Sequence, residues 1–203
     1  MTIEIEPSEK FQNKYCVKSA RLKKWNYSSE GAYFITICLK NCEYFFGEIV
    51  NGKMQLSRIG IVVDKYWREI PKHFPSVILD EYIIMPNHVH GIIMINHNNN
   101  SHRDVAVRRD VAVQRLYRER PKNYKMSMIS PKSQSLSAII RSYKSICTKT
   151  INKMQNQIFF AWQSRFYDRI IRDDNELNRI REYIFINPSN WMKDCNNPEN
   201  LLI

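Results

Sequence analysis

The amino-acid sequence predicts an α+β fold, in which a ferredoxin-like βαββαβ unit forms an antiparallel sheet with helices on one face and an additional C-terminal helix. Three observations lead to this prediction. Strand-like and helix-like segments follow one another in the order strand, helix, strand, strand, helix, strand, helix. Hydrophobic residues make up 43% of the chain and aromatic residues 12%, which is enough for a packed core. The length of 203 residues fits one domain.

The first elements are a strand, a hairpin and a helix. Residues 31–41, "GAYFITICLKN", are rich in β-branched and aromatic residues and are expected to form a strand. Asn51-Gly52 lies between apolar flanks and predicts a two-residue hairpin turn. A helix should begin after Ser57, a favourable cap residue, and end at Pro71.

Two further strands and a long helix come next. Residues 76–85 and 88–96 are predicted strands, joined by Pro86-Asn87. Residues 135–154 have the period of an amphipathic helix. Its apolar face should carry Leu136, Ile139, Ile140, Tyr143, Cys147, Ile151 and Met154.

The last two elements are a strand and a helix. Residues 158–171, "IFFAWQSRFYDRII", predict a strand that contains a turn. Residues 173–186 predict a helix whose acidic start suits the helix dipole. The dipeptide Asn187-Pro188 should end it, because the residue before a proline disfavours the α conformation. A fold of this kind does not define a function.

The distribution of charge indicates a polyanionic partner. The chain has 31 Lys and Arg residues against 20 Asp and Glu residues, a formal net charge of +11. Most of the excess lies in residues 101–153, which hold 13 basic and three acidic residues and so carry a net charge of +10. Such a block is typical of nucleic-acid-binding segments, although a solvated basic loop gives the same pattern.

Two boundaries follow from composition. We expect residues 1–30 to form a basic N-terminal arm and residues 31–203 to form a single domain. Residues 96–133 lack apolar periodicity and contain "RDVAVR" followed by "RDVAVQR", so they are interpreted as a basic loop insertion. This loop either contacts DNA or is an insertion without a role.

Other sequence features narrow the class of protein. The five cysteines form no CxxC pair, which favours reduced thiols and a cytoplasmic, nucleoid-associated location. No stretch approaches 18 uninterrupted apolar residues, so no membrane span is expected. The phosphate-binding pattern GxxxxGK[ST] is missing from the sequence, so no nucleotide cofactor is expected.

His88 and His90 interrupt an apolar strand. Because residues i and i+2 of a strand share a face, the two imidazoles should project together, with Val89 on the opposite face. Neighbouring neutral imidazoles form a platform for a divalent metal, and two buried structural histidines are the alternative. A structural zinc site is disfavoured, because it requires two more His or Cys ligands and His97 and His102 lie in or near the loop.

Tyr183 and Asn187 lie one turn apart on the last predicted helix and therefore share a face. The amide oxygen of Asn187 could bind the same metal, and Tyr183 could supply a phenolic nucleophile. Alternatively, Tyr183 packs in the core beside Leu177 and Ile180, and Asn187 caps the helix. Spacing alone does not decide between these interpretations.

Three segments together resemble the HUH single-tyrosine transposases, in particular the branch of REP-associated tyrosine transposases and transposase-like proteins. The His88-Val89-His90 triplet matches the His, bulky apolar residue, His motif, and the resemblance covers about residues 31–192. The segments are "YIIMPNHVHGIIMI", "SYKSICTKTIN" and "AWQSRFYDRIIRDDNELNRIREYIFINPSNW".

This resemblance implies a transposase that cleaves and rejoins single-stranded DNA in a ferredoxin-like domain. It implies that Tyr183 is the catalytic nucleophile, which forms a 5′-phosphotyrosine link and leaves a free 3′-OH. It also implies that Mg²⁺ or Mn²⁺ is bound by His88, His90 and Asn187. The alternative acidic ligands are Glu182 and Asp168.

The expected partner is single-stranded or hairpin DNA with palindromic repeats, bound by a monomer, with a dimer as the alternative. Phe166 or Tyr167 could stack on unpaired bases. Contacts to DNA are expected from the basic residues Arg141, Lys144, Lys149, Lys153, Arg165 and Arg169. Two other functions remain open: a domesticated protein that binds hairpin DNA without cleaving it, and an RNA-binding ferredoxin-like module. The latter would lack the usual aromatic RNA-binding pattern.

Overall fold

The computed structural model describes residues 25–97, 132–154 and 160–202. Most of the predicted N-terminal arm and nearly all of the predicted loop insertion therefore lie outside the described residues. The predictions for these two segments stay predictions.

The centre of the fold is a four-stranded antiparallel sheet in the order β4-β5-β1-β6. This order is that of the ferredoxin-like unit, in which each pair of strands joined by a helix encloses a third strand. The α+β fold class is thus confirmed. The four strands are β1 (Gly31–Cys38), β4 (Val77–Ile84), β5 (His88–Ile95) and β6 (Tyr167–Ile171).

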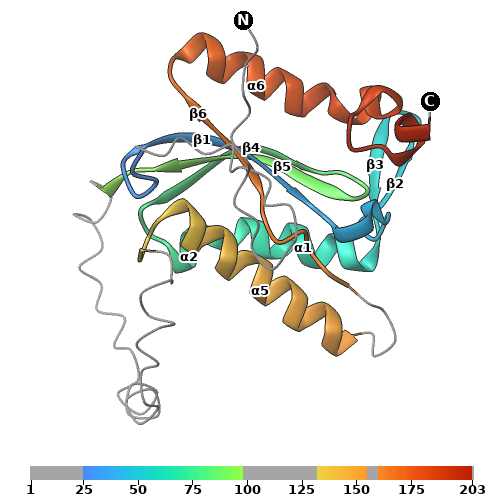
Figure 1. Cartoon of the computed structure of the whole chain (residues 1–203), viewed down its shortest axis with the longest axis horizontal. Coiled ribbons are helices and arrows are strands. Elements are labelled where there is room, and N and C mark those ends of the chain that lie inside the picture. The colour runs from blue at the N-terminus through green and yellow to red at the C-terminus, as the bar shows by residue number, and fades with distance from the viewer. Residues whose placement is uncertain (1–24, 98–131, 155–159, 203) are drawn as a thin grey trace, which may run out of the picture.

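The helices lie in two layers on either side of this sheet (Figure 1). One face is covered by α1 (Arg58–Arg68), the short α2 (Ile70–His73) and the long α5 (Leu136–Met154). The other face carries α6 (Asp174–Ile186), the predicted additional helix. Tyr183, the predicted nucleophile, lies on α6.

A small second sheet consists of the hairpin β2 (Gly47–Val50) and β3 (Lys53–Leu56). The predicted turn joins them, with both residues in the left-handed region: φ is 52° at Asn51 and 71° at Gly52. The hairpin contacts the 3₁₀ helix η3 (Asn187–Lys193) that follows α6. Two more 3₁₀ helices are η1 (Lys40–Cys42) and η4 (Pro198–Leu202).

The start of α1 agrees with the sequence, and its end does not. The side chain of Ser57 caps the helix by accepting from the backbone N–H of Gly60 at 3.0 Å. The helix was expected to end at Pro71, yet it ends at Arg68. Pro71 instead lies in the first turn of α2, where a missing N–H leaves no helical hydrogen bond unmade.

The main core lies between the sheet and the layer of α1 and α5. Alternate residues of β1 and β5 point into it, and the apolar faces of both helices cover them. Its fully buried members include Tyr33, Ile35, Ile37, Val89, Ile93, Val63, Trp67, Ile139 and Cys147. The predicted apolar face of α5 is buried there, except for Met154, which is exposed.

A smaller apolar cluster fixes α6 to the other face of the sheet. Phe34, Ile92 and Ile171 project from three strands and meet Ile184 of α6, with Leu177 and Ile180 packed against them. This cluster therefore sets the height of α6 above the sheet. In the described part of the chain, no helix has both the length and the apolar character needed to cross a membrane.

Candidate metal and nucleophile site

The two histidines of β5 lie side by side on the face of the sheet that α6 covers. Their imidazole centroids are 4.4 Å apart, and both side chains are buried. Val89, between them, is fully buried in the main core on the opposite face. The alternation expected for a strand therefore places both imidazoles in one pocket of the α6 layer.

The ring of His88 is fixed by its neighbour Asn87. The Nδ2 group of Asn87 donates to the backbone oxygens of Cys42 and Asn196, at 3.3 and 2.7 Å, so its Oδ1 must be the atom facing His88. This Oδ1 only accepts, so the 2.7 Å hydrogen bond requires that Nδ1 of His88 carries the proton. Burial lowers the pKa of His88 to about 3, so the ring is neutral near pH 7. Its Nε2 therefore carries a free lone pair.

His90 is held from three directions. Its Nδ1 is hydrogen-bonded to Oγ1 of Thr36 at 2.9 Å, and its ring stacks on Phe34 with centroids 5.4 Å apart. Its Nε2 lies 3.3 Å from the phenolic oxygen of Tyr183. Burial, and then the neighbouring His88, lower the pKa of His90 well below its ordinary value. Both imidazoles are thus neutral near pH 7, the form in which histidine binds metals.

Tyr183 reaches this pair from α6. Its ring packs against His90 and Phe34, and 40% of the residue remains exposed. Burial of the hydroxyl, followed by the charge of Asp194, raises the pKa of Tyr183 to about 12. Tyr143, by contrast, is buried and donates to the backbone of Val63, in the layer of α1 and α5.

Asn187 and Asp194 complete the group. Asn187 donates its Nδ2 proton to Oδ2 of Asp194 at 3.1 Å, and the same Oδ2 lies 3.9 Å from Nε2 of His88. Oδ1 of Asn187 and Nε2 of His88 are both buried without a hydrogen-bond partner. Buried polar atoms in native proteins nearly always have a partner, so these two atoms indicate a missing one.

Asp194 was not found by the sequence analysis. Donor atoms of His88, His90 and Asp194 all lie within 4.8 Å of one another. Two imidazole nitrogens, a carboxylate and an amide oxygen together form a donor set for a divalent metal ion. The two orphaned acceptors and the chemistry of the donors therefore fit a divalent metal. The alternative ligand Glu182 does not belong to this group, and neither does Asp168.

A bidentate ion pair holds α6 over the site. Arg181 donates from Nε and Nη2 to the two carboxylate oxygens of Asp80, at 2.8 and 2.6 Å. Asp80 lies where the register of β4 against β5 shifts, between Leu79 and Tyr82. At the other end of α6, Asp173 caps the helix by accepting from the backbone N–H of Glu176 at 2.8 Å. The ion pair with Asp80 thus ties the part of α6 that carries Tyr183 to β4.

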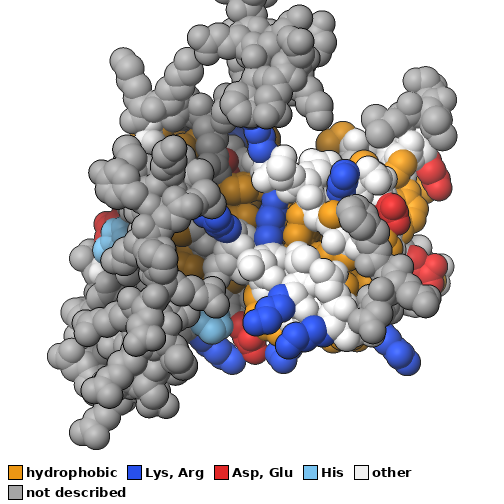
Figure 2. Space-filling view, turned by 60° about the horizontal axis from the view of Figure 1, so that its bottom comes forward, with side chains coloured by type: hydrophobic (Ala, Val, Ile, Leu, Met, Phe, Trp, Pro, Cys, Tyr) orange, Lys and Arg blue, Asp and Glu red, His pale blue; other side chains and the backbone are white. Residues whose placement is uncertain are grey.

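Most of the predicted DNA-binding residues lie in the layer opposite this site. Arg141, Lys149 and Lys153 are exposed on α5. Figure 2 looks toward the layer of α1 and α5, and Lys and Arg side chains are spread over its described part. Lys144 donates to the backbone oxygens of Gln163 and Arg165, at 2.8 and 3.0 Å, so its ammonium holds the segment before β6.

The other two predicted DNA-binding residues lie near β6. Arg165 is exposed just before the strand. Arg169 projects from β6 toward α6, where it forms an ion pair with Glu176 at 2.6 Å. Of the six predicted basic residues, only Arg169 therefore lies on the same sheet face as the two histidines.

Comparison with known proteins gives one sequence relative and one informative structure. An uncharacterized protein of Haemophilus influenzae is 41% identical over 177 residues, which cover 87% of this chain and 91% of the relative. The chain belongs to the family of that protein. No family model matches the sequence.

The solved structure described as the REP-associated tyrosine transposase bound to a REP hairpin has the same fold. It superposes with a TM-score of 0.51 at 15% identity, covering 83% of this chain and 73% of the transposase chain. The resemblance found in the sequence is thus confirmed at the level of the fold. This chain therefore has the fold of that transposase. On it, His88, His90 and Asp194 lie together beside the partly exposed Tyr183.

Proposed function

We propose that this protein is a metal-dependent HUH single-tyrosine transposase that cleaves and rejoins single-stranded DNA. The observation that carries the proposal is the position of Tyr183, whose phenolic oxygen lies 3.3 Å from Nε2 of His90. Beside it lie the buried side chains that could bind a metal ion, two of which have a polar atom without a hydrogen-bond partner. Nucleophile and donors share one face of the sheet, and 40% of Tyr183 remains exposed to substrate.

In this proposal Tyr183 attacks the phosphorus of the scissile phosphodiester. A bond from the phenolic oxygen to phosphorus forms, and the bond from phosphorus to the 3′ oxygen breaks. The phenol gives up its proton, and the departing 3′ oxygen takes one up. The product is a 5′-phosphotyrosine with a free 3′-OH, and attack by such a hydroxyl reverses the step. Because the ester link is preserved, the reaction needs no nucleotide cofactor.

His88, His90 and Asn187 would hold Mg²⁺ or Mn²⁺, and the geometry adds Asp194 to this set. When bound, the ion would polarise the phosphoryl oxygens and neutralise charge on the departing oxygen. The raised pKa of Tyr183 means that the phenol is protonated at neutral pH. The phenol must therefore lose its proton in the course of the attack on phosphorus.

The proposed substrate is hairpin DNA with an adjacent single strand, bound by a monomer. The transposase with the same fold was solved with a REP hairpin. Exposed basic residues of α5, among them Arg141, Lys149 and Lys153, would contact duplex phosphates from the layer opposite the site. The basic segments 1–30 and 96–133 would also contact the hairpin.

A covalent-adduct assay tests the proposal. Labelled single-stranded hairpin DNA with a palindromic repeat is incubated with the protein and Mn²⁺, and the adduct is separated on a denaturing gel. We expect an adduct with the wild type, none with Tyr183→Phe, and none after addition of EDTA. Tyr167→Phe is the matched control and should retain the adduct. If Tyr183→Phe forms as much adduct as the wild type, Tyr183 is not the nucleophile. If the wild type binds the hairpin but forms no adduct, the protein is a non-cleaving hairpin-binding protein.

A further inference from the structure

A row of four paired residues crosses the sheet and links His90 to the exposed ring of Tyr167. Strand pairing aligns Ile83 with His90, His90 with Thr36, and Thr36 with Tyr167. Paired residues in adjacent strands point to the same face, so Tyr167 lies on the face that bears His90. Two strand spacings separate them, or about 10 Å.

Tyr167 differs from the other members of this row in its exposure. His90 is 2% exposed and Thr36 is 7% exposed, whereas Tyr167 is 51% exposed. A large, half-exposed ring that opens beside a proposed DNA-cleaving site offers a stacking surface for a nucleobase.

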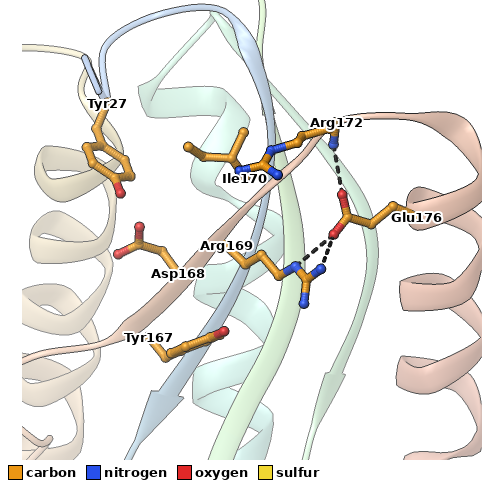
Figure 3. A pocket seen from close by; sticks show the side chains of 7 residues that line it. All are labelled: Tyr27, Tyr167, Asp168, Arg169, Ile170, Arg172 and Glu176. Atoms are coloured by element: carbon orange, nitrogen blue, oxygen red, sulfur yellow. Dashed lines mark hydrogen bonds and ion pairs between the residues drawn. The ribbon is translucent and has the colours of Figure 1, made fainter. Parts of the chain in front are cut away.

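Arg169 lies beside Tyr167 on the same strand and the same side. Figure 3 shows both side chains on one side of β6, with Asp168 on the other side, toward Tyr27. The ion pair with Glu176 uses Nε and Nη2 of Arg169, while 60% of the Arg169 side chain remains exposed. The guanidinium is therefore held in place and still accessible to an anion.

The spacing of Tyr167 and Arg169 matches the spacing of a base and a phosphate in an extended DNA strand. Residues i and i+2 of a β-strand are about 7 Å apart, which suits one base and its neighbouring phosphate. A cavity of about 300 Å³ runs along this edge of β6, lined in part by Tyr167, Arg169 and Glu176. This volume is at the small end for ligand pockets and suits a single nucleotide, whereas a duplex would not fit.

We propose that Tyr167 and Arg169 form a nucleotide subsite, in which an unpaired base stacks on Tyr167 and its phosphate pairs with Arg169. The strand would continue from there along the row toward His90 and Tyr183. This inference rests on the proposed function and adds a binding contact for the single-stranded part of the substrate. The subsite is separate from the basic residues of α5, which lie in the other layer.

Equilibrium binding tests the subsite without relying on cleavage. Fluorescein-labelled oligo(dT) of 15 nucleotides is titrated with the Tyr183→Phe protein, and affinity is followed by fluorescence anisotropy over a range of salt. Stacking tolerates any base, so oligo(dT) serves although the natural sequence is not defined. Tyr167→Ala should weaken binding about 5- to 150-fold, and Tyr167→Phe should leave it within about twofold.

The salt dependence separates stacking from ion pairing. Tyr167→Ala should leave the slope of log K against log salt unchanged, because no phosphate contact is lost. Arg169→Gln should reduce that slope by about 0.7, the value for one phosphate of a single strand. Phe185→Ala is the matched control, since Phe185 is 79% exposed on α6 and lies two residues from Tyr183, on another side of the helix.

Each outcome supports or overturns the subsite. Loss of affinity with Tyr167→Ala but not with Phe185→Ala, and with the slope unchanged, supports it. Equal losses in both variants, or no loss with Tyr167→Ala, overturn it while leaving the adduct assay of Tyr183 unaffected. If the parent protein binds no oligo(dT) at all, the subsite fails, and an adduct formed with hairpin DNA would show that the proposed function survives. Circular dichroism melting confirms that each variant is folded.

Discussion

The phenolic oxygen of Tyr183 lies 3.3 Å from Nε2 of His90. This nitrogen is also the atom that His90 would offer to a metal, because Thr36 is hydrogen-bonded to Nδ1. One nitrogen lone pair cannot accept from the phenol and bind an ion at once. Under the proposed function, Tyr183 must therefore move away from Nε2 before His90 can bind a metal ion.

A first prediction follows for metal affinity. Tyr183→Phe should bind Mn²⁺ at least as tightly as the wild type, because the competing hydroxyl is removed and the ring that packs on Phe34 is kept. Isothermal titration calorimetry on the DNA-free protein measures this. Weaker binding by the variant would mean that the phenolic oxygen is a ligand of the ion instead of a competitor for His90.

Asn87 should act as a positioning residue for His88. Asn87→Ala removes the acceptor that keeps the proton on Nδ1 of His88, and it should lower Mn²⁺ affinity about 10- to 100-fold, the usual effect of losing an outer-shell partner. Nitrogen-15 NMR of the metal-free protein reads the tautomer directly. An Asn87→Ala protein with unchanged tautomer and affinity would contradict this role.

Asn187 and Asp194 should act as one unit. They are hydrogen-bonded to each other at 3.1 Å, so replacing either one disturbs the other. We expect Asn187→Ala and Asp194→Ala each to weaken Mn²⁺ binding. The double variant should lose less than the product of the two single losses, with a coupling of about 0.5–3 kcal/mol. Strictly multiplicative losses in calorimetry would mean that the two side chains contribute independently.

The ion pair of Arg181 with Asp80 should control the position of Tyr183. Asp80→Asn should lower the melting temperature by a few degrees and reduce adduct formation at saturating Mn²⁺. Arg181→Lys keeps the charge but loses the two-pronged geometry, so its effect should be intermediate. If both variants melt lower but form the adduct at the wild-type rate, the pair stabilises the helix without positioning the nucleophile.

The same pair predicts a dependence on pH. Hydrogen bonding to Arg181 lowers the pKa of Asp80 below its ordinary value. A carboxyl group with a lowered pKa stabilises the folded state above its unfolded pKa, and this contribution is lost as the pH falls through the lowered value. The difference in free energy of unfolding between the wild type and Asp80→Asn should therefore be largest at pH 7 and disappear in strong acid. Urea unfolding at a series of pH values measures it, and a constant difference would contradict the linkage.

Gly91 offers a test of how far the two faces of the sheet are independent. A Cβ at this position would collide with the ring of Trp67, on the core face. Gly91→Ala should therefore destabilise the protein by about 1–3 kcal/mol in urea unfolding, as overpacking does. Mn²⁺ affinity of the folded variant should be unchanged, since the affected contact is on the other face from His90. Loss of affinity at temperatures where the variant is folded would show that the faces are coupled.

The sequence predicted the sheet and helices well where hydrophobic periodicity was strong. The alternation of "HVHGIIMI" placed His88 and His90 on one face and Val89 on the other, as the structure shows. The cap at Ser57 and the turn at Asn51-Gly52 were also visible, because each has its own local chemistry. The end of α1 was missed, because a proline can begin a helix as well as end one.

The rest of the site depends on contacts that periodicity does not encode. Asp194 lies after η3 in an irregular segment, and only the fold brings it 3.9 Å from His88. A segment rich in Asn gave no reason to select this residue. Likewise, the basic face of α5 was visible in the sequence, but its position opposite α6 is seen only in the structure.

The segment after α6 has a consequence for how the protein matures. The amide of Asn87 bonds to the backbone of Asn196, 109 residues later, and the carboxylate of Asp194 arrives with the same segment. A chain that stopped soon after Tyr183 would keep the strands of the sheet, both histidines and the tyrosine. It would lack the carboxylate of Asp194 and the hydrogen bond from Asn87 to the backbone of Asn196. We therefore expect such a product of premature termination to fold and to be chemically silent. During synthesis, likewise, the centre would be assembled only after residue 196 has left the ribosome, so the nascent chain could not cut DNA before then.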